Sequence, residues 1–189
     1  MRTISLSLAV AAFLTTVGCK SVERYPDAKT NVTLKGKSVL VAAQDRVSAQ
    51  PAVEAQYRKI AGEAAGTIHV LPIMPAPALE LPVTAARLGL EKKGTEGLDP
   101  MAQLAMTATV KAGNKFGVKF DHVLFVTAEK AGSVNGVMNV DHYAALYEIN
   151  TKRVIAAAKI TGTTTPETAL DQLPRGASVV VNLLLDGAD

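Results

Sequence analysis

Two short apolar runs flank a stretch of helical periodicity in the first half of the chain. Residues 36–45 and 67–74 each have the length and composition of a buried strand. Between them, over residues 51–66, apolar side chains recur every three to four positions, with Pro51 near the start and Gly66 just after the end. This order predicts a β-α-β unit whose two strands pair in parallel through a right-handed crossover.

The middle of the chain alternates between loop and helix signals. Residues 72–82 hold four of the nine prolines and predict a loop, because each proline removes an amide donor. A short helix is expected over 83–94, and a longer one over 99–117, where Asp99 suits the N-cap and Pro100 the first helical position. The apolar face predicted for the longer helix is Met101, Leu104, Ala105, Ala108 and Ala112.

Strand patterns dominate the last third until a final helical segment. Residues 120–130 predict a strand, and residues 141–162 predict a hairpin whose arms alternate around a turn at 150–151. A terminal helix is expected from the Thr-Pro-Glu sequence at 165–167 onward, although residues 174–186 are β-branched enough for a strand to remain the alternative. The chain therefore predicts one α/β domain, with a mixed sheet of about five strands, flanking helices, a late β-hairpin and a C-terminal helix.

The amino-terminal segment has the pattern of a secretory signal peptide. A single basic residue precedes an apolar run over residues 4–18, which is shorter than the ~20 residues that span a bilayer. The only cysteine of the chain, Cys19, follows directly. We therefore expect residues 1–18 to be removed, residues 19–35 to form a polar tether without regular structure, and residues 36–189 to fold as the α/β domain.

The residues around this cysteine resemble the lipobox of bacterial lipoproteins. In that family the thiol corresponding to Cys19 receives a diacylglyceryl group and becomes the mature N-terminus, and Val17 and Gly18 suit the two preceding positions. Thr16 stands where the family usually has Leu, so cleavage at another small residue and a free cysteine in an unprocessed chain are the alternatives. Lys20 follows in place of Asp, which by the resemblance favours the outer membrane, with the domain facing the periplasm.

Composition and charge narrow the class of partner. The net charge of +3 is spread along the chain, and aromatic residues make up only 4% of it, so neither a basic stripe nor a stacking surface for nucleic acid is present. With no second cysteine, the domain has no disulfide and must rely on its core, which 48% hydrophobic residues can supply. We expect a membrane contact through lipid on Cys19, an envelope protein as partner, and no nucleic acid.

Few residues suggest chemistry. The sequence has no GxGxxG, P-loop or GxSxG pattern, and we expect no cofactor. Of three histidines, His122 and His142 each follow an aspartate, and such pairs could form a zinc site if their strands were neighbours. The alternative is that both pairs mark strand entries. Tyr143 and Tyr147 share one face of a predicted strand and are the candidate partner-binding residues, or else ordinary core residues.

The order of elements resembles that of small Rossmann-like periplasmic lipoproteins. The likeness rests on the lipobox, on "KSVLVAAQD" followed by a helix pattern, on the hairpin sequence "YEINTKRVIAAAKITG" and on a terminal helix ending in "LLLDG". That group includes activators of peptidoglycan synthases and lipoproteins of polysaccharide and curli export. The resemblance implies a non-enzymatic binding or assembly module for another cell-envelope protein, and it carries over no functional residue. The competing hypothesis is a periplasmic hydrolase or metal-binding enzyme that uses His122 and His142 with nearby aspartates.

Overall fold

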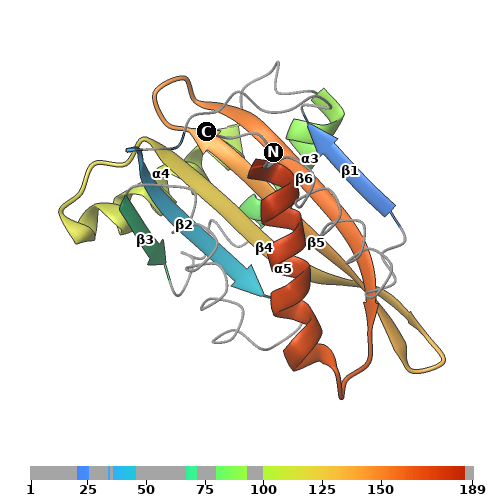
Figure 1. The fold of residues 1–189 in the computed structure, drawn as a ribbon. Helices are drawn as coiled ribbons and strands as arrows, with labels where there is room; N and C mark the ends of the chain where they lie inside the picture. The colour runs from blue at the N-terminus through green and yellow to red at the C-terminus, as the bar shows by residue number, and fades with distance from the viewer. Residues whose placement is uncertain are drawn as a thin grey trace, which may run out of the picture.

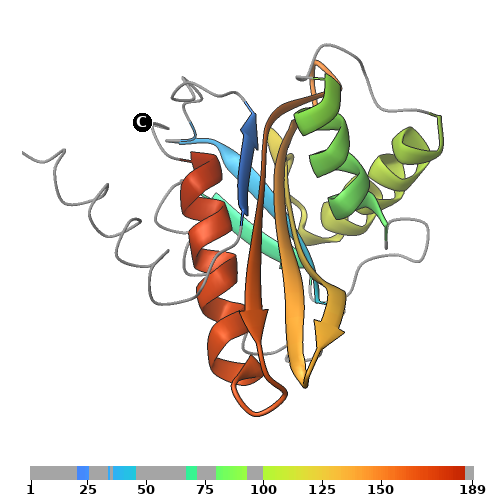
Figure 2. The same ribbon diagram turned by 90° about the vertical axis from the view of Figure 1, so that its right-hand side faces the viewer.

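The computed structural model describes residues 21–25, 34, 36–45, 67–71, 80–92 and 100–185. Within this part of the chain, a six-stranded mixed sheet in the order β1-β6-β5-β4-β2-β3 carries helices on both faces (Figures 1 and 2). The described elements are β1 (Ser21–Tyr25), β2 (Ser38–Asp45), β3 (Thr67–Leu71), α3 (Leu81–Lys92), α4 (Pro100–Gly113), the 3-10 helix η2 (Asn114–Phe116), β4 (His122–Val134), β5 (Val137–Glu148), β6 (Arg153–Thr164) and α5 (Ala169–Leu185). The predicted α/β class is confirmed, with one strand more than expected.

The parallel part of the sheet comprises β3, β2 and β4. β2 pairs in parallel with both neighbours, and its residues 39–43 are buried, with alternate side chains packed in the core clusters on the two faces of the sheet. The parallel pairing of the first two predicted strands is thereby confirmed. The helix expected over residues 51–66 lies outside the described residues.

The antiparallel part consists of two consecutive hairpins. The β5–β6 hairpin is confirmed, with its turn at 149–152. The β4–β5 hairpin was not expected: β4 continues past residue 130 to Val134, and the chain reverses at Asn135 and Gly136, whose φ angles are 52° and 78°. Positive φ at both central residues is the conformation of a two-residue type I′ turn, and Asn-Gly suits it best.

The sixth strand lies in the segment for which we expected a tether. Instead of lacking regular structure, Ser21–Tyr25 forms β1 and pairs antiparallel with β6, from Ser21 opposite Thr161 to Tyr25 opposite Ala157. Its side chains are polar because an edge strand is only half buried, and the Ser21 hydroxyl donates to the Thr161 hydroxyl at 3.1 Å. The prediction of an unstructured tether is therefore wrong for these residues, which form a strand of the sheet.

Of the described helices, α5 covers one face of the sheet, while α3 and α4 cover the other (Figure 2). The terminal-helix prediction is confirmed over its strand alternative, and α5 buries Leu173, Ala177, Val180 and Leu184. α3 begins at Leu81 rather than after the proline-rich segment, because Pro82 lies in the first turn, where no amide donor is needed. None of the described helices is long and apolar enough to cross a membrane.

Helix α4 packs on a different face from the one expected. Its buried residues are Ala102, Ala105, Met106, Thr109 and Gly113, whereas Met101 is 72% and Leu104 56% exposed. Small side chains on the buried face let α4 approach the sheet closely: a Cβ at Gly113 would lie 2.6 Å from Cδ2 of Leu40. Because α4 lies this close to the sheet, mostly small residues are buried beneath it, and the larger side chains of Met101 and Leu104 are exposed to solvent.

Candidate functional site

The two tyrosines expected to bind a partner lie on β5 and face α3 and α4. Both side chains are buried, so Tyr143 and Tyr147 do not form one exposed aromatic surface. Burial raises the pKa of Tyr147 above its ordinary value. Tyr143 belongs to a polar cluster, and Tyr147 forms part of the wall of a groove.

The groove lies between α4 and the β5–β6 turn. It has a volume of about 210 Å³, and Met106, Val110, Tyr147 and Ile149 provide its apolar surface. Gln103 and Thr107 of α4 add polar groups to its wall, but the Thr107 hydroxyl already donates to the Gln103 carbonyl oxygen at 2.9 Å. A mostly apolar wall with a few polar groups is the composition that ligand pockets usually have, here at a volume below their usual range of roughly 300–1,000 Å³.

Two lysines give this groove its charge. Lys111 projects from the last turn of α4 and Lys152 from the β5–β6 turn, and no carboxylate is among the described residues that line the groove. Lys152 has a φ of 55°, in the left-handed region that costs a residue with a side chain about 1–2 kcal/mol. Glycine adopts this conformation without that cost, so a glycine would be more favourable than a lysine at this position.

The exposed apolar face of α4 adjoins the groove. Leu104 lies three and seven residues before Thr107 and Lys111, so the three share one side of the helix. Met101 lies one turn earlier and is more exposed still. We call the groove itself the α4 groove; its described lining residues are Gln103, Met106, Thr107, Val110, Lys111, Tyr147, Ile149 and Lys152. Met101 and Leu104 extend it into a wider apolar surface with positive charge at its edge.

The histidines expected to share a metal ion lie far apart. His142 pairs with Ala128 on β4, six residues along the strand from His122, which corresponds to roughly 20 Å. Among the described residues, no three His, Cys, Asp or Glu side chains are placed to hold a metal ion. This geometry does not fit an enzyme that uses His122 and His142 in one site.

His122 is a strand-entry residue, which agrees with the alternative interpretation of its Asp-His pair. Asp121 Oδ2 accepts a hydrogen bond from the backbone N–H of Ser38 at 2.9 Å and so fixes the start of β2 to the start of β4. Nε2 of His122 lies 3.9 Å from Oε1 of Glu148 on the adjacent strand. Burial lowers the pKa of His122, although the carboxylates of Glu148 and Asp121 act in the opposite direction.

His142 is enclosed beneath α5. A Cβ at Gly176 would lie 2.7 Å from Cδ2 of the imidazole and closer still to Cε1 and Nε2, so only glycine fits there. Burial lowers the pKa of His142 to about 4, although the carboxylate of Asp141 acts to raise it. The adjoining cavity has a volume of about 10 Å³, which is room for one water molecule and for no substrate.

A polar cluster on the opposite face joins β5, β6 and β1. Asp141 accepts hydrogen bonds from Thr161 at 2.6 Å and from Tyr143 at 3.3 Å, and its Oδ2 lies 3.1 Å from the Lys159 ammonium nitrogen. Burial lowers the pKa of Lys159, but the hydrogen bond and charge of Asp141 outweigh it, and the pKa is raised. Lys159 also lies 4.0 Å from Glu23 of β1. The cluster fastens the edge strand to the sheet.

Sequence reasoning missed the α4 groove because its parts come from separate segments. Lys111 and Lys152 are forty-one residues apart and carry no motif. The only available signal was Lys152, a basic residue directly after the predicted turn at 150–151. A tight turn often contains a residue with positive φ, and a lysine is unusual there.

No protein-family model matches the chain, and no curated protein matches it in sequence. Among solved structures it is similar to the PelC dodecamer from Paraburkholderia phytofirmans, at 13% identity and a TM-score of 0.49, covering 89% of this chain and 99% of that one. Lipoprotein GNA1162 from Neisseria meningitidis matches at 15% identity and a TM-score of 0.40, covering 77% and 96% of the two chains. At these values the function has to be argued from the chain's own residues.

Proposed function

We propose that this chain is a periplasmic lipoprotein, anchored in the outer membrane through Cys19, whose α/β domain binds another cell-envelope protein without catalysing a reaction. The observation that carries the proposal is the α4 groove, whose described lining residues combine apolar surface with two lysines and include no carboxylate. Such a groove favours a partner segment that presents an apolar side chain beside an acidic one. The sequence around Cys19 supports the anchor.

Two further features support binding through this surface. The apolar face of α4, with Met101 and Leu104, is exposed rather than packed on the sheet. Large apolar side chains at the edge of a groove are the kind of residue that a partner buries. Lys152 keeps an unfavourable backbone conformation at the groove, which a purely structural turn would relieve with glycine.

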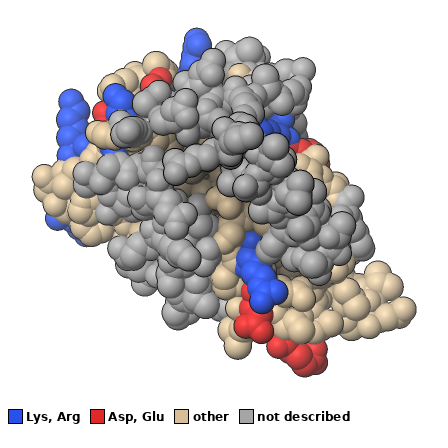
Figure 3. Space-filling model, in the orientation of Figure 1, with Lys and Arg blue, Asp and Glu red and all other residues tan. Residues whose placement is uncertain are grey.

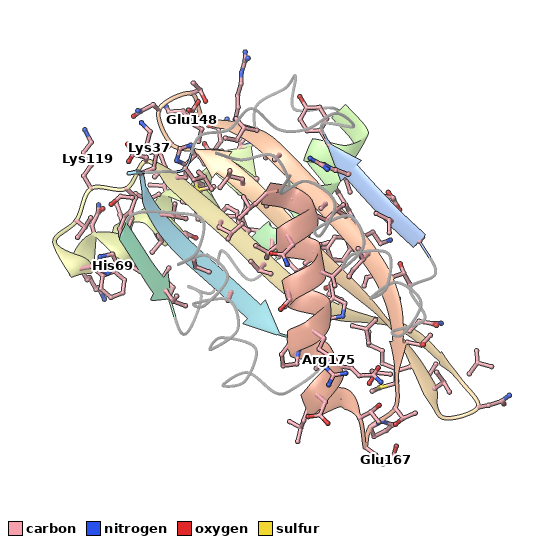
Figure 4. All side chains as sticks on the ribbon, viewed as in Figure 1. Lys37, His69, Lys119, Glu148, Glu167 and Arg175 are labelled. Carbon is pink, nitrogen blue, oxygen red and sulfur yellow. The ribbon has the colours of Figure 1, made fainter. Side chains whose placement is uncertain are left out.

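The test is chemical crosslinking and capture from membranes of bacteria that express the tagged full-length chain. Wild type is compared with Cys19→Ala, with Lys111→Glu, and with Arg175→Glu, which makes the same charge change on the exposed side of α5 (Figure 4). We expect Cys19→Ala to leave the outer-membrane fraction. We expect Lys111→Glu to stay in that fraction but to capture several-fold less of one recurrent protein, because a like charge then faces the acidic side chain of the partner.

The Arg175→Glu variant is the matched control and should capture as much as wild type. Equal capture by the Lys111→Glu and Arg175→Glu variants would contradict the assignment of the α4 groove as the binding surface. An unchanged membrane fraction for Cys19→Ala would contradict the lipid anchor.

A further inference from the structure

The β4–β5 hairpin projects beyond the rest of the sheet and ends in exposed apolar residues. Val134 is 66% and Val137 39% exposed, on either side of the Asn135-Gly136 turn. Residues 131–140 contain no charged side chain, and the projecting end shows neither blue nor red in Figure 3. An uncharged apolar tip at the end of a hairpin is a surface for which water is a poor solvent.

The same end of the molecule is where the chain comes from Cys19. Ser21 pairs with Thr161, and Thr161 pairs with Asp141. The first residue of β1 therefore lies level with Asp141 of β5, four residues along that strand from Val137 at the hairpin tip. Four residues of strand span about 14 Å, and β1 lies two strand spacings, about 10 Å, from β5. The two residues from Ser21 back to Cys19 reach about 7 Å at most. A lipid on Cys19 and the hairpin tip can therefore touch one plane.

We propose that the hairpin tip, Val134 and Val137, docks onto the lipid bilayer that holds the Cys19 anchor and inserts its two valines into the interface. The proposal rests on the lipidation of Cys19 in the proposed function. Because β1 is part of the sheet and only Lys20 separates it from Cys19, the anchor holds the domain against the membrane at this end. The α4 groove, which includes the β5–β6 turn at the other end of β5, then faces away into the periplasm.

Another exposed apolar residue near this end fits a lipid surface less well. Leu170, at the start of α5, is 65% exposed, but Glu167 and Asp171 lie beside it in sequence. Figure 4 shows Glu167 projecting at the turn that precedes α5. Anionic lipids repel carboxylates, so the hairpin and not the helix is assigned to the bilayer. Insertion stays shallow, at the headgroup boundary, because the turn has backbone groups that need water.

The experiment uses the full-length, lipidated protein purified from membranes. Since Cys19 is blocked by lipid, Val134→Cys supplies a single thiol for an environment-sensitive NBD fluorophore, and Thr151→Cys supplies the matched control in the β5–β6 turn. Both are reconstituted into vesicles of phosphatidylethanolamine with a minority of phosphatidylglycerol. Quenching by lipids with a nitroxide on the acyl chain is then measured. We expect a blue shift and loss of emission at position 134, and neither at position 151.

Two results would overturn the docking inference. If the protein floats with the vesicles and position 134 emits and is quenched like position 151, the hairpin stays in water, and the docking inference is overturned while the anchor stands. If the protein does not float and Cys19 has no lipid by mass, both the anchor and the docking inference are overturned. The same measurement at Val137→Cys keeps the test valid should one substitution disturb folding.

Discussion

The contact between Gly176 and His142 makes a sharp prediction about how α5 packs. Replacing Gly176 with alanine introduces a Cβ that lies 2.7 Å from Cδ2 of the imidazole, whereas ordinary contacts begin at 3.4 Å. His142 is buried on β5 and cannot swing into solvent, so the helix or the strand must move. Movement of α5 loosens the packing of its neighbours Leu173 and Ala177.

Two opposing effects set the magnitude. Overpacking a buried site costs typically about 1–3 kcal/mol, and the short contact places this site near the upper end. Alanine in place of glycine inside a helix recovers about 1 kcal/mol. Gly176→Ala should therefore lower the free energy of unfolding by about 2 kcal/mol, which corresponds to a fall in Tm of about 4–8 °C for a chain of this size.

Urea unfolding followed by circular dichroism, in a double-mutant cycle, tests the reasoning. In a His142→Ala background the ring is absent, and Gly176→Ala should then stabilise the protein by up to about 1 kcal/mol. Asn182→Ala, at an exposed position of α5, is the control and should change stability by a few tenths of a kcal/mol in both backgrounds. An equal loss from Gly176→Ala in both backgrounds would refute the steric account.

Three other predictions concern His142, Lys152 and Asp141. Burial lowers the pKa of His142 to about 4, so the stability of the wild type is fully present above pH 6.5 and falls toward pH 4. In urea unfolding, His142→Gln should remove about 2 kcal/mol of the stability loss between pH 7 and pH 5. The control Ile160→Val should leave the pH dependence unchanged. Lys152→Gly should raise stability by about 0.5–1 kcal/mol by thermal unfolding while reducing partner capture, and a loss of stability would contradict the strain argument. Asp141→Ala should lower the free energy of unfolding by about 1.5–3 kcal/mol, because Lys159 loses its carboxylate partner. Adding Lys159→Met in the same chain should restore part of that loss, and no restoration would contradict this reason.

The pattern of apolar and polar residues was sufficient to predict the α/β class, the mixed sheet and the late hairpin. Strand β2 was readable as a continuous apolar run, the β5–β6 hairpin by its alternation, and α5 by the Thr-Pro-Glu sequence at 165–167 that precedes it. The Asn135-Gly136 turn was equally readable, since Asn-Gly between β-branched residues is a strong hairpin signal, but it lay where the strand was expected to have ended.

Other features depend on contacts between distant segments. β1 is a strand only because β6 offers it a free edge, and its mixed polar sequence has no pattern that predicts this. The buried face of α4 was misassigned because apolar size alone favoured Met101 and Leu104, whereas close packing on Leu40 required small residues. The α4 groove joins a helix to a turn and could not be seen in either segment alone.

The central claim, that the α4 groove holds a segment of an envelope protein, is tested most directly by site-specific photocrosslinking in living cells. A photoreactive phenylalanine is placed at Thr107, in the groove wall, or at Arg175, on the exposed side of α5. The account predicts one discrete adduct from position 107, diminished when Lys152→Glu is added, and no such adduct from position 175. The same adducts from both positions, or none from position 107 in protein that is folded and membrane-bound, would contradict it.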